Sequence, residues 1–327
     1  MTKIKMFSLS LVAFAIISCG GDTTETNTKT VGKNSNVAPG LESNTSSESS
    51  SAKDNIFRLN FSDPPTFDPA LVTDTTSASI IVEIFSGLVT LNKELDIIPD
   101  LAESWDISDD GRIYTFNLRD DIKFSNGDKV TASDFKWSIE RAANPDTGSM
   151  NAEVYLGDIV GVTEVIEAGG SLTEVSGLKV IDDKTLEITI DEPKTYFLAK
   201  LTYPTAFVLS EKYVTQQGED WIDQPVGTGP FVMTEYQIGQ TLKLKPNDNY
   251  WGEKAKVDGI IMNLAGGVSM AMYENDEVDI TGVGLADLER VKDPNDPLNK
   301  DLVNVPPQFS LNYIGFNVNM PPFDDVN

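Results

Sequence analysis

The stretch "LAESWDISDDGRIYTFNLRDDIKFSNGDKVTASDF", residues 101–135, carries the most regular pattern in the chain. Tyr114, Phe116 and Leu118 alternate with polar residues, which predicts a half-buried strand. The sequence Asp109-Asp110-Gly111 predicts a turn before this strand. The first half of the stretch therefore predicts a β-hairpin.

The second half of the stretch predicts another turn and a helix. Asn126-Gly127 is a dipeptide that permits positive φ at both residues of a tight turn. Thr131 stands three residues before Asp134, which is the spacing of a capping box. A helix is expected to follow, with Phe135, Ile139 and Ala142 on one face.

Acidic residues in and around the stretch raise the question of a metal site. Asp106, Ser108, Asp110 and Gly111 match the first half of an EF-hand loop, but Asn117 occupies the twelfth position, where a bidentate glutamate is required. A strand also follows where a helix should. The adjacent acidic pairs elsewhere indicate solvated turns, because neighbouring residues on a strand point to opposite faces; they are Asp120-Asp121, Asp182-Asp183 and Asp324-Asp325. We expect neither a metal nor a cofactor.

Strands and helices alternate on both sides of this stretch. The alternation in residues 56–61 predicts a strand, and the isoleucines of residues 76–85 recur at helical spacing. Residues 185–192 alternate again, and a further strand is expected from residue 241. Trp105, Trp137, Tyr250 and Trp251 are expected mainly in core or cross-strand packing, although such rings also stack on sugars. Gly227-Thr228-Gly229 lacks the lysine of a phosphate loop.

Composition narrows the range of functions. The formal net charge is −26, which opposes binding to nucleic acid or to anionic lipid. The chain has no histidine, which excludes histidine-dependent hydrolases and histidine-bearing zinc sites. It has a single cysteine, so it cannot form a disulfide within itself. Packing and hydrogen bonds are expected to hold the fold together.

The N-terminal segment predicts export. Lys3 and Lys5 precede an apolar run over residues 6–18 that is too short to span a bilayer. The residues before Cys19 resemble a bacterial lipobox, which implies lipidation of Cys19 after removal of residues 1–18. An alternative is that Cys19 merely ends a discarded peptide. Residues 19–54 are rich in Ser, Thr, Asn and Gly, which predicts a flexible tether.

Several motifs in collinear order resemble one protein family. They are the stretch 101–135, "VGTGPF" at residues 226–231, "NYWG" at residues 249–252 and "PPFDDVN" at residues 321–327. Together they resemble the bacterial extracellular solute-binding proteins of family 5, and the spacing is similar to that of the oligopeptide-binding members. The resemblance covers residues 55–327 and implies an α/β fold of the type II periplasmic-binding-protein kind, with mixed sheets.

The resemblance also implies a division of the chain. Residues 55–87 and 201–306 would form lobe one, and residues 88–200 a small β-rich second domain. Residues 307–327 would begin the crossover to an opposing lobe that is largely missing from this chain. In the family, the two lobes close around the solute by a hinge.

Site residues follow from position in the family. The loop Val72-Thr73-Asp74-Thr75 matches the segment that hydrogen-bonds the ligand backbone, although Asp74 could simply cap the next helix. Asn151 falls where peptide binders place an aromatic contact, and departs from that pattern. Gly282 lies on a segment that approaches the cleft in relatives, but it could equally terminate a helix or strand. No catalytic residue is expected.

The function implied is that of a monomeric, lipid-anchored receptor in the cell envelope. It would capture oligopeptides or a similar small solute and deliver them to an ABC permease of the cytoplasmic membrane. Nickel chelates or oligosaccharides are alternative solutes. A glycoside hydrolase would need two carboxyl groups roughly 5–10 Å apart across an open cleft, and a surface adhesin or scaffold would need a broad exposed apolar patch.

Overall fold

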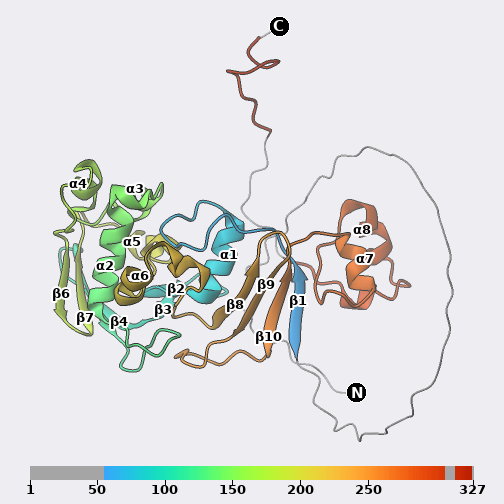
Figure 1. Ribbon diagram of the computed structural model, residues 1–327, viewed down its shortest axis with the longest axis horizontal. Coiled ribbons are helices and arrows are strands. Elements are labelled where there is room, and N and C mark those ends of the chain that lie inside the picture. Colours follow the sequence, from blue (N-terminus) through green and yellow to red (C-terminus); the bar gives the residue numbers. More distant parts are fainter. Residues whose placement is uncertain (1–54, 306–313, 326–327) are drawn as a thin grey trace, which may run out of the picture. The chain divides into compact units, whose positions relative to one another are not determined.

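The computed structural model describes residues 55–305 and 314–325 (Figure 1). The predictions on the export signal, on Cys19 and on the tether lie outside these residues. The described residues divide into two compact units, the first ending at Gly282 and the second beginning at Val283, and each is described by itself. No helix among the described residues is long and apolar enough to cross a membrane.

A four-stranded mixed sheet lies at the centre of the first unit. Its strand order is β1-β10-β9-β8, with bounds Ile56–Asn60, Gly259–Asn263, Thr241–Pro246 and Phe231–Gln237. β1 runs parallel to β10, and the other pairs are antiparallel. A parallel β-bridge from Leu59 to Ile280 adds a further segment beside β1. The chain entering and leaving this sheet therefore comes from distant parts of the sequence.

A second four-stranded sheet is wholly antiparallel. Its order is β4-β5-β7-β6, with bounds Ala102–Ile107, Ile113–Leu118, Thr185–Thr189 and Leu178–Asp182. A short hairpin of β2 (Val89–Leu91) and β3 (Ile97–Pro99) precedes it. Figure 1 shows the helices α2, α3 and α4 gathered beside this second sheet.

The helices of the first unit are short apart from α1 and α2. Their bounds are α1 Thr75–Ile84, α2 Ala132–Ala143, α3 Ala152–Leu156, α4 Val162–Glu167, α5 Phe197–Lys200, α6 Glu211–Gln217 and α7 Ser269–Glu274. Short 3₁₀ helices cover Pro145–Thr147, Pro204–Ala206 and Gly218–Asp223. The second unit contains α8 (Leu285–Lys292) and a 3₁₀ turn at Asn299–Asp301.

Two hydrophobic cores account for these layers. The first lies under the mixed sheet, where α1 buries Ile80, Ile81 and Ile84 against residues of β9 and β10. The second lies between the antiparallel sheet and α2, whose Phe135, Ile139 and Ala142 are buried as their helical spacing predicts. Burial of such side chains is worth about 1.5–3 kcal/mol each, so packing supplies most of the driving force.

The local predictions for residues 101–135 are largely confirmed. The strand, the turn at Asp109-Asp110-Gly111 and the helix all form, and the Thr131 N–H donates to Asp134 Oδ2 at 2.9 Å as in a capping box. The turn at Asn126-Gly127 also forms, and of its two residues only Gly127 adopts the positive φ that this dipeptide permits, at +91°. The Asn126 side chain instead accepts from the Asp128 N–H, which closes the turn locally.

The glycines of Gly227-Thr228-Gly229 have a packing role. A Cβ on Gly227 would lie 2.0 Å from the Ile84 carbonyl oxygen, so only glycine fits against the end of α1. The Gly229 N–H donates to the same carbonyl at 2.8 Å, and the Thr228 hydroxyl accepts from the Ser86 N–H. The motif therefore joins β8 to α1 by close backbone contact.

The α/β prediction is confirmed, and one of the two larger sheets is mixed as expected. The strand predicted over residues 185–192 is shorter, and Ile190 makes only an isolated bridge to Ile159. Trp105, Trp137 and Trp251 pack against the hydrophobic cores as expected. The Arg119 guanidinium also stacks 3.8 Å from the centre of the Trp251 ring.

Candidate ligand-binding site

The candidate site is the loop that connects β1 to α1, residues 61–74. Parallel strands share the direction in which their chains leave a sheet, so this loop and the segment after Ile280 leave the mixed sheet at the same edge. In α/β proteins, ligands characteristically bind outside the carboxyl ends of such strands. Topology therefore places the start of this loop and the segment that leads to Gly282 at the same edge of the sheet.

Aromatic and charged contacts hold the first half of the loop. Phe67 packs edge-on against Tyr236, with ring centres 4.8 Å apart and planes at 88°. Asp63 accepts from the Tyr236 hydroxyl at 2.9 Å and from the Gly239 N–H at 2.5 Å. Burial raises the pKa of Tyr236 to about 12, and the hydrogen bond to Asp63 contributes. These contacts attach the loop to the β8–β9 hairpin.

A buried ion pair holds the middle of the loop. Arg141 of α2 donates to both carboxylate oxygens of Asp68, at 3.1 and 2.5 Å. Asp68 also accepts from the Ala70 N–H at 2.9 Å, and the Arg141 guanidinium lies 5.5 Å from the centre of the Trp221 ring. A bidentate pair of this kind fixes distance and orientation together. The loop is thereby attached to α2, the longest helix among the described residues.

The predicted binding residues Val72–Thr75 complete the loop and begin the helix. Asp74 is the N-cap of α1, and its carboxylate accepts from the Ser77 N–H at 2.8 Å. Thr75 is the first residue of α1. Val72 is fully buried, whereas Thr73 is exposed. Within the described chain, the Thr73 N–H and C=O make no hydrogen bond, so both are free to pair with a ligand.

Asn151 lies directly against this loop. Its Nδ2 donates to the Val72 carbonyl at 2.7 Å, and the Tyr203 hydroxyl lies 3.4 Å from the same oxygen. Tyr155 stacks on Tyr203 with ring centres 3.7 Å apart and planes at 5°. Burial, together with the neighbouring Tyr155, raises the pKa of Tyr203. The structure therefore brings together two predicted site residues, Val72 and Asn151, that are far apart in sequence.

Gly282 is not part of this contact. It is exposed at the end of the first unit, and its described hydrogen bond is accepted by its own carbonyl from the Thr281 hydroxyl. A Cβ on Gly282 would meet nothing within 4 Å. Its segment is anchored upstream, where Arg58 pairs with Asp279 at 2.8 Å. The described structure thus places Gly282 near the sheet edge without a contact to Val72 or Asn151.

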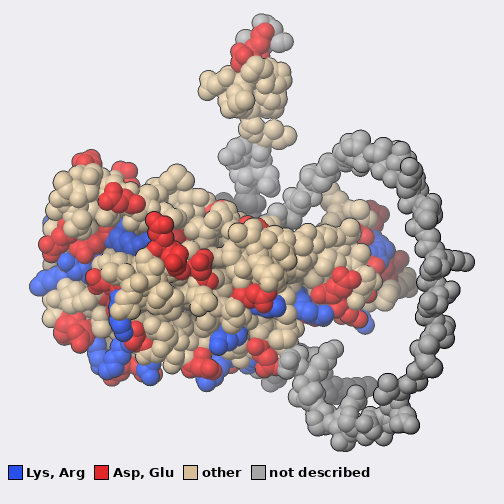
Figure 2. Space-filling view, in the orientation of Figure 1, with Lys and Arg blue, Asp and Glu red and all other residues tan. Residues whose placement is uncertain are grey.

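Apolar side chains border the loop and α3. Leu71 is 36% exposed, Met150 75% and Val154 58%, and each is next to or one turn from a residue of the Val72–Asn151 contact. Figure 2 shows that the visible face over α1 carries few charged residues, whereas the face over the antiparallel sheet carries both signs interspersed. This border suits a ligand with mixed apolar and polar groups.

Sequence reasoning missed Tyr155, Tyr203 and the Asp68–Arg141 pair. Their partners are separated by roughly fifty to eighty positions in the sequence, and none belongs to a motif that marks a site. A Tyr-Pro dipeptide at residues 203–204 was the sole local feature around Tyr203, and it indicates only a turn.

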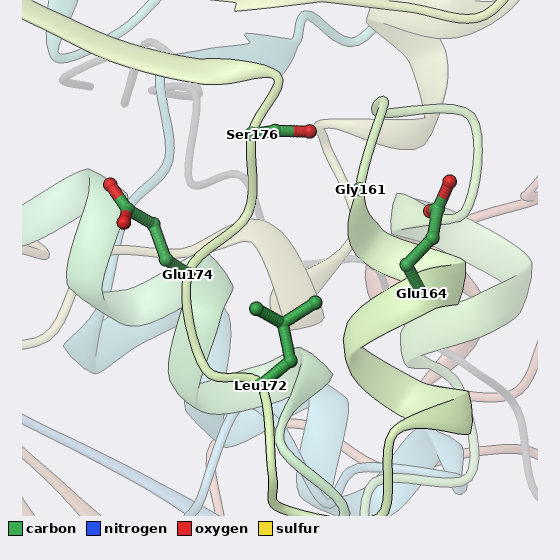
Figure 3. A pocket seen from close by; sticks show the side chains of 5 residues that line it. All are labelled: Gly161, Glu164, Leu172, Glu174 and Ser176. Atoms are coloured by element: carbon green, nitrogen blue, oxygen red, sulfur yellow. The ribbon is translucent and has the colours of Figure 1, made fainter.

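A separate hollow of about 470 Å³ lies between α4 and residues 172–176 (Figure 3). Gly161, Glu164, Leu172, Glu174 and Ser176 line it. The two carboxylates point away from each other on either side of Leu172, and Glu174 pairs with Lys136 at 3.1 Å. This geometry does not match the facing carboxyl groups that a glycoside hydrolase requires. Among the described residues, no group of three or more acidic or cysteine side chains is placed to hold a metal ion.

Comparisons with known proteins agree on one family. The model for bacterial extracellular solute-binding proteins, family 5, matches residues 96–327. The chain is 30% identical over 303 residues to the dipeptide-binding protein DppE of Bacillus subtilis, covering 91% of this chain and 54% of that protein. It is 31% identical over 281 residues to the periplasmic oligopeptide-binding protein OppA of Escherichia coli, covering 84% and 51%.

Solved structures give the same result. The substrate-binding domain of an oligopeptide ABC transporter from Bacillus anthracis superposes with a TM-score of 0.69 at 32% identity, over 75% of this chain and 48% of that one. Peptide-bound OppA of Listeria monocytogenes gives 0.69 at 30% identity, over 75% and 50%. The chain spans about half the length of the curated relatives it matches.

Proposed function

The chain belongs to the bacterial extracellular solute-binding proteins of family 5, and from this membership we propose that it serves as the solute receptor of an ABC importer, with peptides as its ligands. The names of its relatives support peptides as the ligands. DppE and OppA are named as dipeptide- and oligopeptide-binding proteins, and one superposed structure holds a peptide. None of these names denotes an enzyme, and we propose a binding function without catalysis.

The observation that carries the proposal is the exposed main chain of Thr73. Thr73 is exposed, and its N–H and C=O have no hydrogen-bond partner among the described residues, which supports pairing with a strand-like ligand. A ligand residue in extended conformation would pair with both groups. The exposed Leu71, Met150 and Val154 would then contact the side chains of the ligand.

Magnitudes indicate how much of the affinity this loop supplies. Each backbone hydrogen bond contributes about 0.5–1.5 kcal/mol, so a pair at Thr73 gives roughly 1–3 kcal/mol. Micromolar binding requires about 8 kcal/mol. Most of the affinity would therefore come from other contacts, including those of an opposing lobe in the whole protein. Gly282, on the segment beside β1, is proposed as a further contact at that cleft.

The domain division and the cellular placement belong to the same proposal. Residues 55–87 and 201–306 would form lobe one and residues 88–200 the second domain, a division supported by the two separate hydrophobic cores. Residues 307–327 would lead toward the opposing lobe. A lipidated Cys19 would hold a monomeric receptor at the envelope beside its permease, since two or more acyl chains give stable anchoring.

Titration calorimetry on the full-length protein tests which class of solute it binds. Tri-, tetra- and penta-alanine are the probes, with a nickel chelate, maltotriose and deoxycholate as competing solute classes; one relative is named as a probable deoxycholate-binding protein. Binding of a peptide near a 1:1 ratio supports the proposal. Binding of another solute, or of none, contradicts it.

Two variants at Thr73 sharpen this test. Thr73→Pro removes the main-chain N–H, and we expect affinity for the alanine peptides to fall about tenfold, as the loss of one hydrogen bond with an unpaired partner predicts. Thr73→Ala keeps the main chain and should bind within about twofold of wild type. Equal loss in both variants would show that the side chain, and not the backbone, binds the ligand.

A further inference from the structure

The side chain of Asn151 does not cap the helix that follows it. Asn151 is the N-cap residue of α3, where an asparagine oxygen normally accepts from the first turn of its own helix. No such bond forms here, and the Ala152 N–H donates to Ser149 Oγ instead. Asn151 Nδ2 donates to the carbonyl of Val72, 79 positions earlier in the chain.

The hydrogen bond from Asn151 to the Val72 carbonyl also constrains the direction of the Thr73 N–H. The carbonyl of Val72 and the N–H of Thr73 belong to one planar unit, and in a trans peptide these two groups point in opposite directions. Because Asn151 and Tyr203 hold the carbonyl from the protein side, the Thr73 N–H is directed away from them. Thr73 is exposed and its N–H is unpaired, as this orientation predicts.

The groups that hold the carbonyl are themselves fixed. Leu156 of α3 is buried in the second hydrophobic core and Ala152 is buried as well, which anchors the helix that carries Asn151. The Tyr203 ring is stacked on Tyr155 of the same helix, and Asn151 Nδ2 lies 3.2 Å from the Tyr203 hydroxyl. Both donors therefore approach the Val72 carbonyl from one rigid support.

We propose that Asn151, assisted by Tyr203, is a positioning residue of the ligand-binding loop: it holds the Val72 carbonyl inward so that the Thr73 N–H faces the acceptor group of a ligand. The acceptor would be a peptide carbonyl or a carboxylate. Asn151 acts through Val72 and need not touch the ligand. The role in ligand binding rests on the proposed function, whereas the effect on the loop does not.

The effect on the loop is measured without ligand. In deuterated, ¹⁵N-labelled protein, the Thr73 amide should have an order parameter in the rigid range of about 0.85, and in Asn151→Ala we expect it to fall below about 0.6. Asn151→Asp is the sharper variant, because aspartate can cap α3 but has no donor for the Val72 carbonyl. We expect it to move the Thr73 resonance while thermal stability stays near that of wild type.

Two control variants separate this role from general stability. Tyr213→Phe removes a hydroxyl that donates to the Gln224 carbonyl at 2.8 Å and makes no bond to Val72, whereas Tyr203→Phe removes one that faces the Val72 carbonyl. We expect only the second to change the Thr73 amide. An unchanged Thr73 amide in Asn151→Asp and in Tyr203→Phe overturns the proposal, even if Asn151→Ala fails to fold.

The binding arm uses tetra-alanine as the probe. Asn151→Asp should weaken its binding about 5- to 10-fold, the equivalent of one neutral hydrogen bond, and Tyr213→Phe should leave it unchanged. Wild-type affinity in Asn151→Asp overturns the link to the ligand. If wild-type protein binds no peptide, the proposed function fails, and the amide measurements alone still decide whether Asn151 positions the loop.

Discussion

Removal of the negative charge at Asp68 should destabilise the protein far more than removal of a similar charge at its surface. Asp68→Asn keeps an oxygen that can accept from the Ala70 N–H, but leaves the Arg141 guanidinium without its carboxylate. The two side chains are only 7% and 18% exposed, so water cannot replace the lost partner. Breaking a buried pair on one side costs about 3–5 kcal/mol.

The matched control is Asp128→Asn. Its partner Lys212 lies 3.0 Å away, as close as a salt bridge requires, but the two side chains are 39% and 63% exposed. Exposed pairs contribute about 0–1 kcal/mol. With an m-value of about 3 kcal/mol/M, urea unfolding should show a midpoint about 1–1.7 M lower for Asp68→Asn, and about 0.3 M lower or less for the control.

A double variant tests the stated cause. Asp68→Asn with Arg141→Met removes the unpaired charge along with its partner, and part of the lost stability should return. The reasoning is refuted if Asp68→Asn costs no more than Asp128→Asn. It is also refuted if the double variant is as unstable as the sum of the two single ones, because then the cost would come from packing and not from the isolated charge.

Two further predictions concern the end of α1. Burial raises the pKa of Glu83 to about 7 from an ordinary 4.5. Between these two pH values the folded state therefore binds more protons than the unfolded state. The free energy of unfolding should fall by roughly 3 kcal/mol as the pH rises from about 4.5 to 7. Glu83→Gln should remove this part of the pH dependence in urea titrations at pH 5 and 7.5, and the exposed Glu94→Gln should not; equal slopes in both variants would contradict burial as the cause. Gly227→Ala should lower the thermal midpoint by 10 °C or more, at about 2–4 °C per kcal/mol, because its Cβ would meet the Ile84 carbonyl at 2.0 Å. Gly282→Ala, which meets nothing within 4 Å, should shift it by less than about 2 °C, and similar shifts in both would show that the close approach carries no cost.

Elements that depend on neighbouring residues could be predicted from the sequence. The strand at residues 113–118 follows from alternation, and α2 from its capping box and its apolar face. The turn at residues 126–127 was placed correctly, and only Gly127 adopts the positive φ that the dipeptide permits, because the Asn126 side chain bonds locally and needs no positive φ. Local chemistry determined where the chain turns, and a single side-chain hydrogen bond determined how.

In the candidate site, too, the features that depend on neighbouring residues could be predicted and those that depend on distant residues could not. The loop at residues 72–75 could be located because it precedes a capped helix and matches a family position, and Asp74 does cap α1. Its orientation could not be predicted, because it depends on Asn151, whose residue type suggests a helix cap and nothing more. Only the folded chain shows that this asparagine bonds elsewhere.

The two kinds of contact around this loop differ in what they can affect. The Asp68–Arg141 pair is buried and charged, so its loss lowers the stability of the whole fold. The Asn151–Val72 bond is neutral and partly exposed, so its loss costs little stability but frees one peptide plane beside Thr73. Loss of the first contact should therefore lower the midpoint of unfolding far more than the affinity for ligand, whereas loss of the second should lower the affinity far more than the midpoint. Binding and unfolding measured on the same two variants, Asp68→Asn and Asn151→Asp, would show opposite losses if the loop is built in this way, and parallel losses if a single network supports both fold and site.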